Sequence, residues 1–152
     1  METRSQLEPA PLAHRVLAAI LDSTFVFLVF FYIAWTFGDI RPNGERVLSG
    51  MPGLLLMLGM LAYWVLPEWL LGSTMGKWAC DLQVTTLRGG SISFMQSLKR
   101  NLLRAIDFFP FYLTGFVAAS LTPNRQRLGD LWANTIVVRK KDIQQETAQS
   151  VS

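Results

Sequence analysis

Two long apolar runs restrict how this chain of 152 residues can fold. They cover residues 16–37 and 51–71, and each holds about 20 residues, enough for a helix to cross a hydrocarbon core roughly 30 Å thick. The chain is 51% hydrophobic and only 16% charged, which is too apolar for an ordinary soluble domain. We therefore expect an all-α integral membrane protein with two full spans.

The segments beside these runs are polar. Residues 1–15 lack a short apolar core followed by a small-residue cleavage site, so the first run is expected to be a retained span and not a cleaved signal. Residues 38–50 are rich in turn formers and predict a loop on the far side of the membrane. We expect a single membrane domain over residues 1–141, followed by a disordered polar tail over 142–152.

A third apolar segment, Ile106–Leu121, is short for a span and contains Pro110. Five Lys or Arg residues lie in the 72–104 stretch before it and five lie after residue 121. If both basic stretches are cytoplasmic, as the positive-inside tendency favours, the chain between them re-enters as two half-helices. Otherwise residues 105–121 cross the membrane and the tail lies outside.

Two further elements are expected near this segment. Ser93 and Gln96 form a capping-box pattern that starts an amphipathic helix with Phe94 and Leu98 on one side and Lys99 on another, typical of the membrane interface. Residues 82–86 and 134–139 are β-branched, and could pair as a two-stranded cytoplasmic ribbon if both lie on one side.

Arg15 and Asp22 are the charged residues most out of place in this pattern. They are seven residues apart, so both lie on one helix face, together with Ala18, but about two turns apart, too far for direct contact by most rotamers. An ionised carboxylate inside a span needs a partner, water or a proton. The partner of Asp22 could be one of the later arginines, Arg100, Arg104 or Arg127. A purely structural pair and a role in ion or substrate handling both remain open.

Two other carboxylates are candidates. Glu68 lies where the second span ends, and either a solvated end charge or a functional group fits that position. Asp107 stands at the mouth of the third apolar segment, where it is either a half-helix cap or a functional carboxylate.

Several functional classes have little support. The run Gly72–Lys77 resembles a phosphate loop, but it is one residue short and has Trp78 in place of the Ser or Thr. One histidine and one cysteine leave too few ligands for a structural zinc site, and no hydrolase motif is present. We expect no enzyme, no cofactor and no metal. The basic residues beside apolar runs indicate anionic lipid headgroups as partners rather than nucleic acid.

The order of these motifs along the chain resembles the RDD family of bacterial membrane proteins. The resemblance rests on Arg15 and Asp22 in the first helix, and on the motifs Gly-Ser-Thr-Met-Gly-Lys77, Arg100-Asn-Leu-Leu-Arg-Ala-Ile-Asp107 and Arg125-Gln-Arg-Leu-Gly-Asp130. It implies that the family's arginine and two aspartates fall on Arg15, Asp22 and either Asp130 or Asp107. It also implies a multi-pass protein of the bacterial inner membrane, with suggested roles in transport.

Two hypotheses follow for function. In the first, Asp22 and Asp107 exchange a proton against a cation while Arg15 keeps their pKa low, and the protein acts as an oligomer because two or three segments enclose little of a path. Small residues would make the contacts between copies: Ala18, Ala19, Gly59, Ala62, Gly115 and Ala118. In the second, the chain is a non-transporting module that binds a partner protein and whose buried charges hold its helices together.

Overall fold

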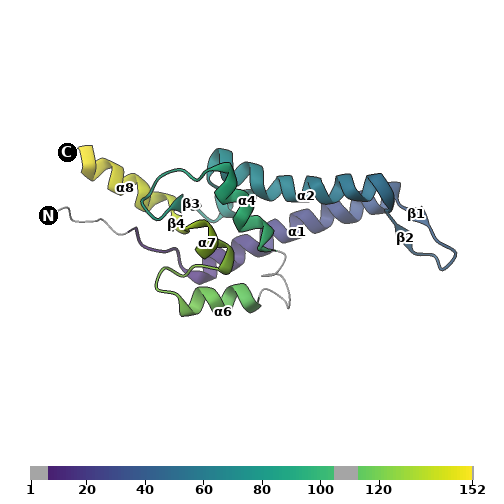
Figure 1. The fold of residues 1–152 in the computed structure, drawn as a ribbon, viewed down its shortest axis with the longest axis horizontal. Coiled ribbons are helices and arrows are strands. Elements are labelled where there is room, and N and C mark those ends of the chain that lie inside the picture. Colours follow the sequence, from purple (N-terminus) through teal and green to yellow (C-terminus); the bar gives the residue numbers. More distant parts are fainter. Residues whose placement is uncertain (1–6, 105–112, 152) are drawn as a thin grey trace.

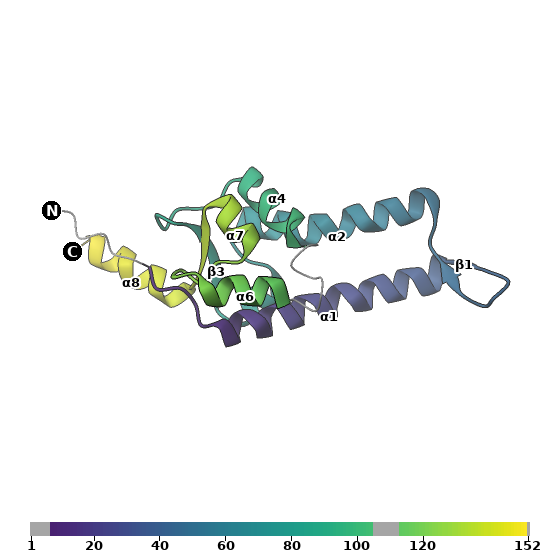
Figure 2. The ribbon, with the colours of Figure 1, turned by 60° about the horizontal axis from the view of Figure 1, so that its bottom comes forward.

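The computed structural model of the chain describes residues 7–104 and 113–151. Two long helices, α1 (Leu12–Phe37) and α2 (Gly50–Leu71), run alongside each other through most of the molecule (Figures 1 and 2). Within the described ranges, these are the helices long and apolar enough to cross a membrane. Most of their large apolar side chains are exposed, as expected for surfaces that face lipid. Because α1 begins at Leu12, directly after Pro11, Arg15 is already helical.

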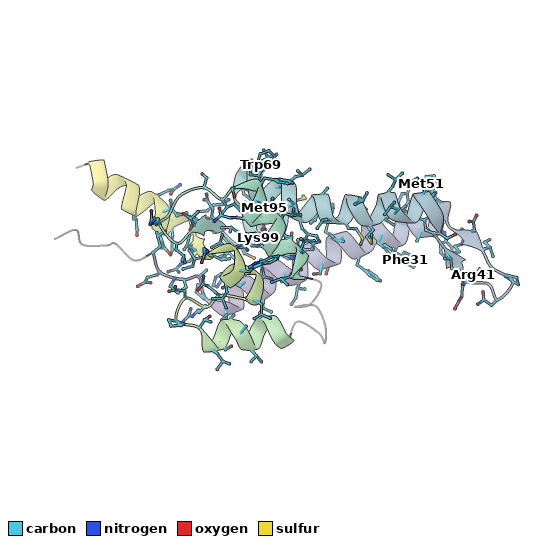
Figure 3. All side chains as sticks on the ribbon, viewed as in Figure 1. Phe31, Arg41, Met51, Trp69, Met95 and Lys99 are labelled. Carbon is cyan, nitrogen blue, oxygen red and sulfur yellow. The ribbon has the colours of Figure 1, made fainter. Side chains whose placement is uncertain are left out.

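The loop between the two long helices forms a short hairpin. Strands β1 (Asp39–Ile40) and β2 (Arg46–Val47) pair antiparallel, and Gly44 adopts a positive φ at the turn. The guanidinium of Arg46 lies 4.6 Å from the centre of the Trp35 ring, which ties the hairpin to the end of α1. Figure 3 shows Arg41 at the tip, at the opposite end of the molecule from both chain termini.

The other end of the molecule is a compact polar unit, which we call the head: residues 72–104 and 113–139. Its elements are α3 (Met75–Ala79), β3 (Leu82–Thr86), α4 (Phe94–Leu102), α6 (Leu113–Leu121), α7 (Leu128–Ala133) and β4 (Thr135–Arg139). The head packs onto the long helices at two places, α3 against α1 and α4 against α2.

A two-stranded ribbon forms the apolar centre of the head. β3 and β4 pair antiparallel from Leu82 opposite Arg139 to Thr86 opposite Thr135. The backbone N–H of Ala10 donates to the carbonyl of Val137, so the segment before α1 is attached to the ribbon. The segments expected from their β-branched residues to be strands thus lie at the same end of the molecule.

Helix α4 is polar on its inner side and apolar on its outer side. Ser93 and Gln96 form both capping-box hydrogen bonds that their spacing predicts. Ser97 and Arg100 are buried, whereas Met95 is exposed (Figure 3). Helix α7 repeats this arrangement, with Asp130 buried and Leu131 and Trp132 exposed. Both helices therefore have the reverse of the polarity that water favours.

Helix α6, in the third apolar segment, lies at the head end and does not approach the hairpin in either view (Figures 1 and 2). Helices α4 and α7 pack against each other, so the chain that follows α4 comes back to that helix at α7. Pro110 and Asp107 lie outside the described residues.

The end of the chain differs from the expected disordered tail. Residues Lys140–Val151 form helix α8, which extends away from the head (Figure 1). Its sequence is rich in Lys, Gln, Glu and Ala, which are good helix formers despite their polarity. An ion pair between Arg139 and Asp142, 3.3 Å from Nε to Oδ2, supports its first turn.

Candidate functional site: a buried network of charged side chains

The side chain of Asp22 joins α1 to α2 and α3. It is only 1% exposed. The Tyr63 hydroxyl donates to Oδ1 at 2.9 Å, the Gly76 N–H donates to the same oxygen at 2.8 Å, and the Thr74 hydroxyl donates to Oδ2. All three donors are neutral groups. The prediction that Arg100, Arg104 or Arg127 would pair with Asp22 is wrong within the described residues. The contacts of Asp22 come instead from α2 and the start of α3, which are nearer to it in the sequence.

The local sequence explains this close approach. Gly72 adopts a left-handed conformation that ends α2, and Thr74 then begins α3. At Gly76 an added Cβ would lie 2.4 Å from the carbonyl oxygen of Ala18 and 2.8 Å from Cγ of Asp22. Only glycine lets the α3 backbone come this near to α1 and place its N–H on the carboxylate.

Arg15 joins α1 to α7. One of its guanidinium nitrogens lies 2.6 Å from Oδ2 of Asp130, and another donates to the carbonyl of Arg125. Both charged side chains are buried, with 8% and 1% of their surfaces exposed. Arg15 therefore reaches groups of the later part of the chain, whereas Asp22 contacts α2 and the start of α3.

Asp130 also organises the start of α7. Its Oδ2 accepts the Arg127 N–H at 3.2 Å and lies 4.0 Å from Nε of that arginine, while Oδ1 is 3.0 Å from Arg100. Burial alone would raise the pKa of Asp130, but the positive charges of Arg100, Arg15 and Arg127 outweigh it and hold the pKa well below its ordinary range. Asp130 is thus ionised at any physiological pH.

Glu68 is the most buried carboxylate of the described chain. None of its side-chain surface is exposed, which overturns the solvated-end-charge interpretation. The Lys77 ammonium contacts Oε1 directly, Nε of Arg100 lies 3.2 Å from Oε2, and Arg104 is 3.7 Å from Oε1. The side-chain amide of Asn101 also donates to Oε2 at 3.1 Å.

Arg100 connects the two halves of this network. It contacts Glu68 through Nε and Asp130 through a terminal nitrogen, which also donates to the Thr135 hydroxyl at 2.8 Å. Next to it, burial and the positive charge of Arg100 lower the pKa of Lys77 well below its ordinary value. A continuous set of charged contacts therefore runs from Arg15 on α1, through α7 and α4, to the end of α2 and α3.

One signal in the sequence could have identified Glu68. Ser97, Arg100 and Asn101 on α4 and Arg104 just after it are spaced so that they form a single polar stripe. In a helix flanked by apolar residues, such a stripe needs polar partners inside the protein, and Glu68 is the acidic residue of the span that precedes it.

The model of the RDD family matches residues 9–134, which is most of the chain. The chain therefore belongs to the RDD family, and together with its two apolar helices this makes it a membrane protein. No curated protein and no solved structure gave a match. The matched range ends just before β4, so it includes Arg15, Asp22 and Asp130.

Proposed function

We propose that this RDD-family protein is a subunit of an assembly that transports a proton or a monovalent cation across the bacterial inner membrane, with Asp22 as the ion-binding group. One observation carries the proposal. Asp22 lies inside a membrane helix, is held by neutral donors and lines a groove of about 800 Å³ between α1, α2 and α3. A carboxylate in a span without a cationic partner keeps its affinity for a proton or a small cation.

Two spans enclose too little space for a transport path, so we propose that the protein works as an oligomer or with a partner membrane protein. The two long helices support this proposal because most of their large apolar side chains are exposed. Asp107, the second carboxylate of the exchange hypothesis, lies outside the described residues. Asp130 and Glu68 are already neutralised by cations and suit a supporting role.

For topology, we propose that the N-terminus, the head apart from α6, and the tail are all cytoplasmic. The packing of α4 on α7 and the pairing of β3 with β4 support this arrangement, because both bring residues 72–104 and the chain after 121 to the same end. Residues 105–121 then re-enter the membrane without crossing it. The exposed apolar sides of α4 and α7 would face the lipid interface, next to anionic headgroups.

A labelling experiment tests this topology. Cys80 is the single cysteine and lies in the head, so a membrane-impermeant maleimide should label it only in opened cells. Asn43→Cys, in the hairpin and in a Cys80→Ser background, should react in intact cells. Lys141→Cys in the same background reports on the tail, and its labelling from outside would refute the re-entrant arrangement.

A flux experiment tests the function. Purified protein in liposomes with an imposed sodium or proton gradient should dissipate the gradient, and Asp22→Asn should not. Asparagine keeps the size of the side chain and can still hydrogen bond to Tyr63 and Thr74, so the variant should stay folded. Glu45→Gln, in the exposed hairpin, is the matched control and should transport normally. Equal flux by wild type and Asp22→Asn would reject the proposal.

The alternative function is a non-transporting module that holds a partner in the membrane. It is favoured by Arg100, which connects two carboxylates on different elements and leaves them no evident role beyond holding the head to the spans. On this alternative, neither wild type nor Asp22→Asn moves ions, and the variant is less stable than wild type.

A further inference from the structure

Two grooves lie end to end between α1 and α2. The outer groove, nearer the hairpin, has a volume of about 670 Å³ and no charged residue among its lining side chains. The inner groove, nearer the head, has a volume of about 800 Å³ and is lined mainly by apolar residues of α1, α2 and α3. Gly59 belongs to the outer groove, and a Cβ added there would meet nothing within 4 Å.

The two grooves form one crevice. Phe25 and Tyr63 line both of them, with ring centres 5.3 Å apart. The lining residues of α1 recur every three or four positions from Leu21 to Phe37, so they lie on one side of the helix. At 1.5 Å per residue this side is about 24 Å long, which exceeds the roughly 15 Å depth of one leaflet's hydrocarbon.

A cation stands at the inner end of the crevice. Lys140, the first residue of α8, lines the inner groove, and its ammonium lies 5.5 Å from the centre of the exposed Trp78 ring. Among the described residues it makes no ion pair. A lysine beside a tryptophan is typical of the level of lipid headgroups.

We propose that this crevice is a binding site for one phospholipid with an anionic headgroup. The headgroup phosphate pairs with Lys140 beside Trp78, and one acyl chain lies in the inner groove and reaches past Phe25 and Tyr63 toward Gly59. The apolar side chains of the lining accept the chain, and the single cation at the membrane surface selects the charge of the headgroup. Asp22 belongs to the same wall, but its carboxylate is buried against Tyr63, Thr74 and Gly76 and is not part of the surface that the chain covers.

Charge distinguishes a lipid from a second copy of this chain. A helix of another copy lying in the crevice would have to bring an anion to Lys140. The acidic residues of α1 and α2 are Asp22 and Glu68, and both are buried within their own copy. The exposed sides of the two long helices thus offer no anion to pair with Lys140. An anionic phospholipid offers both the anion and an acyl chain that fits the crevice.

Native mass spectrometry of the purified, delipidated protein tests the proposal. Phosphatidylglycerol and phosphatidylcholine with identical acyl chains are the probes. We expect a one-to-one adduct that favours phosphatidylglycerol roughly fivefold, the ratio that one lysine near a membrane surface provides. Lys140→Gln should reduce phosphatidylglycerol to the phosphatidylcholine level, while the matched variant Lys141→Gln should leave it unchanged.

A second variant tests the acyl-chain position. Gly59→Leu fills the outer part of the crevice and should cause loss of both lipid adducts. Leucine is also the better helix former and a Cβ there meets open space, so the variant should keep the Tm of wild type, and a Tm measurement separates this loss from unfolding. The proposal is overturned if both lipids bind equally, if Lys141→Gln has the effect expected of Lys140→Gln, or if protein dimers replace the lipid adduct. The mass-spectrometric assay measures lipid binding and does not depend on ion flux. The lipid inference and the transport proposal can therefore fail separately.

Discussion

Replacing Glu68 by glutamine is the sharpest test of the charged network. The substitution keeps the size of the side chain and removes one negative charge from a fully buried position. Lys77, whose ammonium contacts that carboxylate, would then be buried beside Arg100 with its nearest counter-charge gone. Asn101 can still hydrogen bond to the new side chain, so the change is mainly electrostatic.

The expected effect follows from the burial of these groups. Removing one partner of a buried ion pair costs about 3–5 kcal/mol, because the remaining charge is uncompensated in a poorly polarisable surrounding. For a chain of this size, 1 kcal/mol corresponds to roughly 2–4 °C in Tm, so Glu68→Gln should lower the Tm by about 6–20 °C. Glu45→Gln removes an exposed carboxylate of the hairpin and should change the free energy of unfolding by less than about 1 kcal/mol.

Thermal unfolding in detergent, followed by circular dichroism, measures both variants. Lys77→Met in the Glu68→Gln background removes the uncompensated cation and should recover part of the lost stability, with a coupling of about 1 kcal/mol or more between the two positions. The reasoning is refuted if Glu68→Gln is no more destabilising than Glu45→Gln, or if the two substitutions at positions 68 and 77 simply add.

Three further predictions concern single positions. Gly76→Ala should destabilise by about 1–3 kcal/mol because its Cβ would collide with Ala18, whereas Gly59→Ala, with open space around it, should be neutral or stabilising by up to about 1 kcal/mol; equal effects in chemical denaturation would contradict this. The folded-state pKa of Asp130 lies below its unfolded value of about 3.9, so its contribution is complete above that pH and is lost as the pH falls through the folded value. The Tm difference between wild type and Asp130→Asn should therefore shrink in acid, and a difference that grows below about pH 4 would be inconsistent with the pairing. Ser93→Ala should lower stability by about 1 kcal/mol through loss of the α4 cap, and an unchanged midpoint would show that the cap is dispensable.

Local features of this chain could be predicted well from the sequence. The two long helices follow from apolar runs, and the start of α4 follows from the Ser93 and Gln96 pair, because both depend only on neighbouring residues. The ribbon partners were recognisable from their β-branched residues, and the helix rise correctly excluded direct contact between Arg15 and Asp22.

The partners of the buried charges could not be predicted in the same way. Asp22 is bound by a hydroxyl and an amide of the short segment after α2, and no periodic pattern indicates where an irregular turn will place them. Glu68 was ambiguous because an acidic residue at the end of a span is also the usual position of a solvated charge. Its burial depends on α4 packing against that end of α2, which is a tertiary contact.

The depth of Arg15 and of Asp22 in the membrane distinguishes a charge that stabilises the protein from one that takes part in transport. Helix α1 has 26 residues, about 39 Å, so roughly 9 Å of it extends beyond a 30 Å hydrocarbon core. If its far end matches the outer interface, Arg15 lies outside the core, and Asp22, about 15 Å from the helix start, lies roughly 6 Å inside it. If this carboxylate only joined the helices, Asp22→Asn would weaken its hydrogen bonds and lower the stability, as the non-transporting alternative expects. Retention of stability together with loss of flux in Asp22→Asn would therefore assign the charge itself to transport.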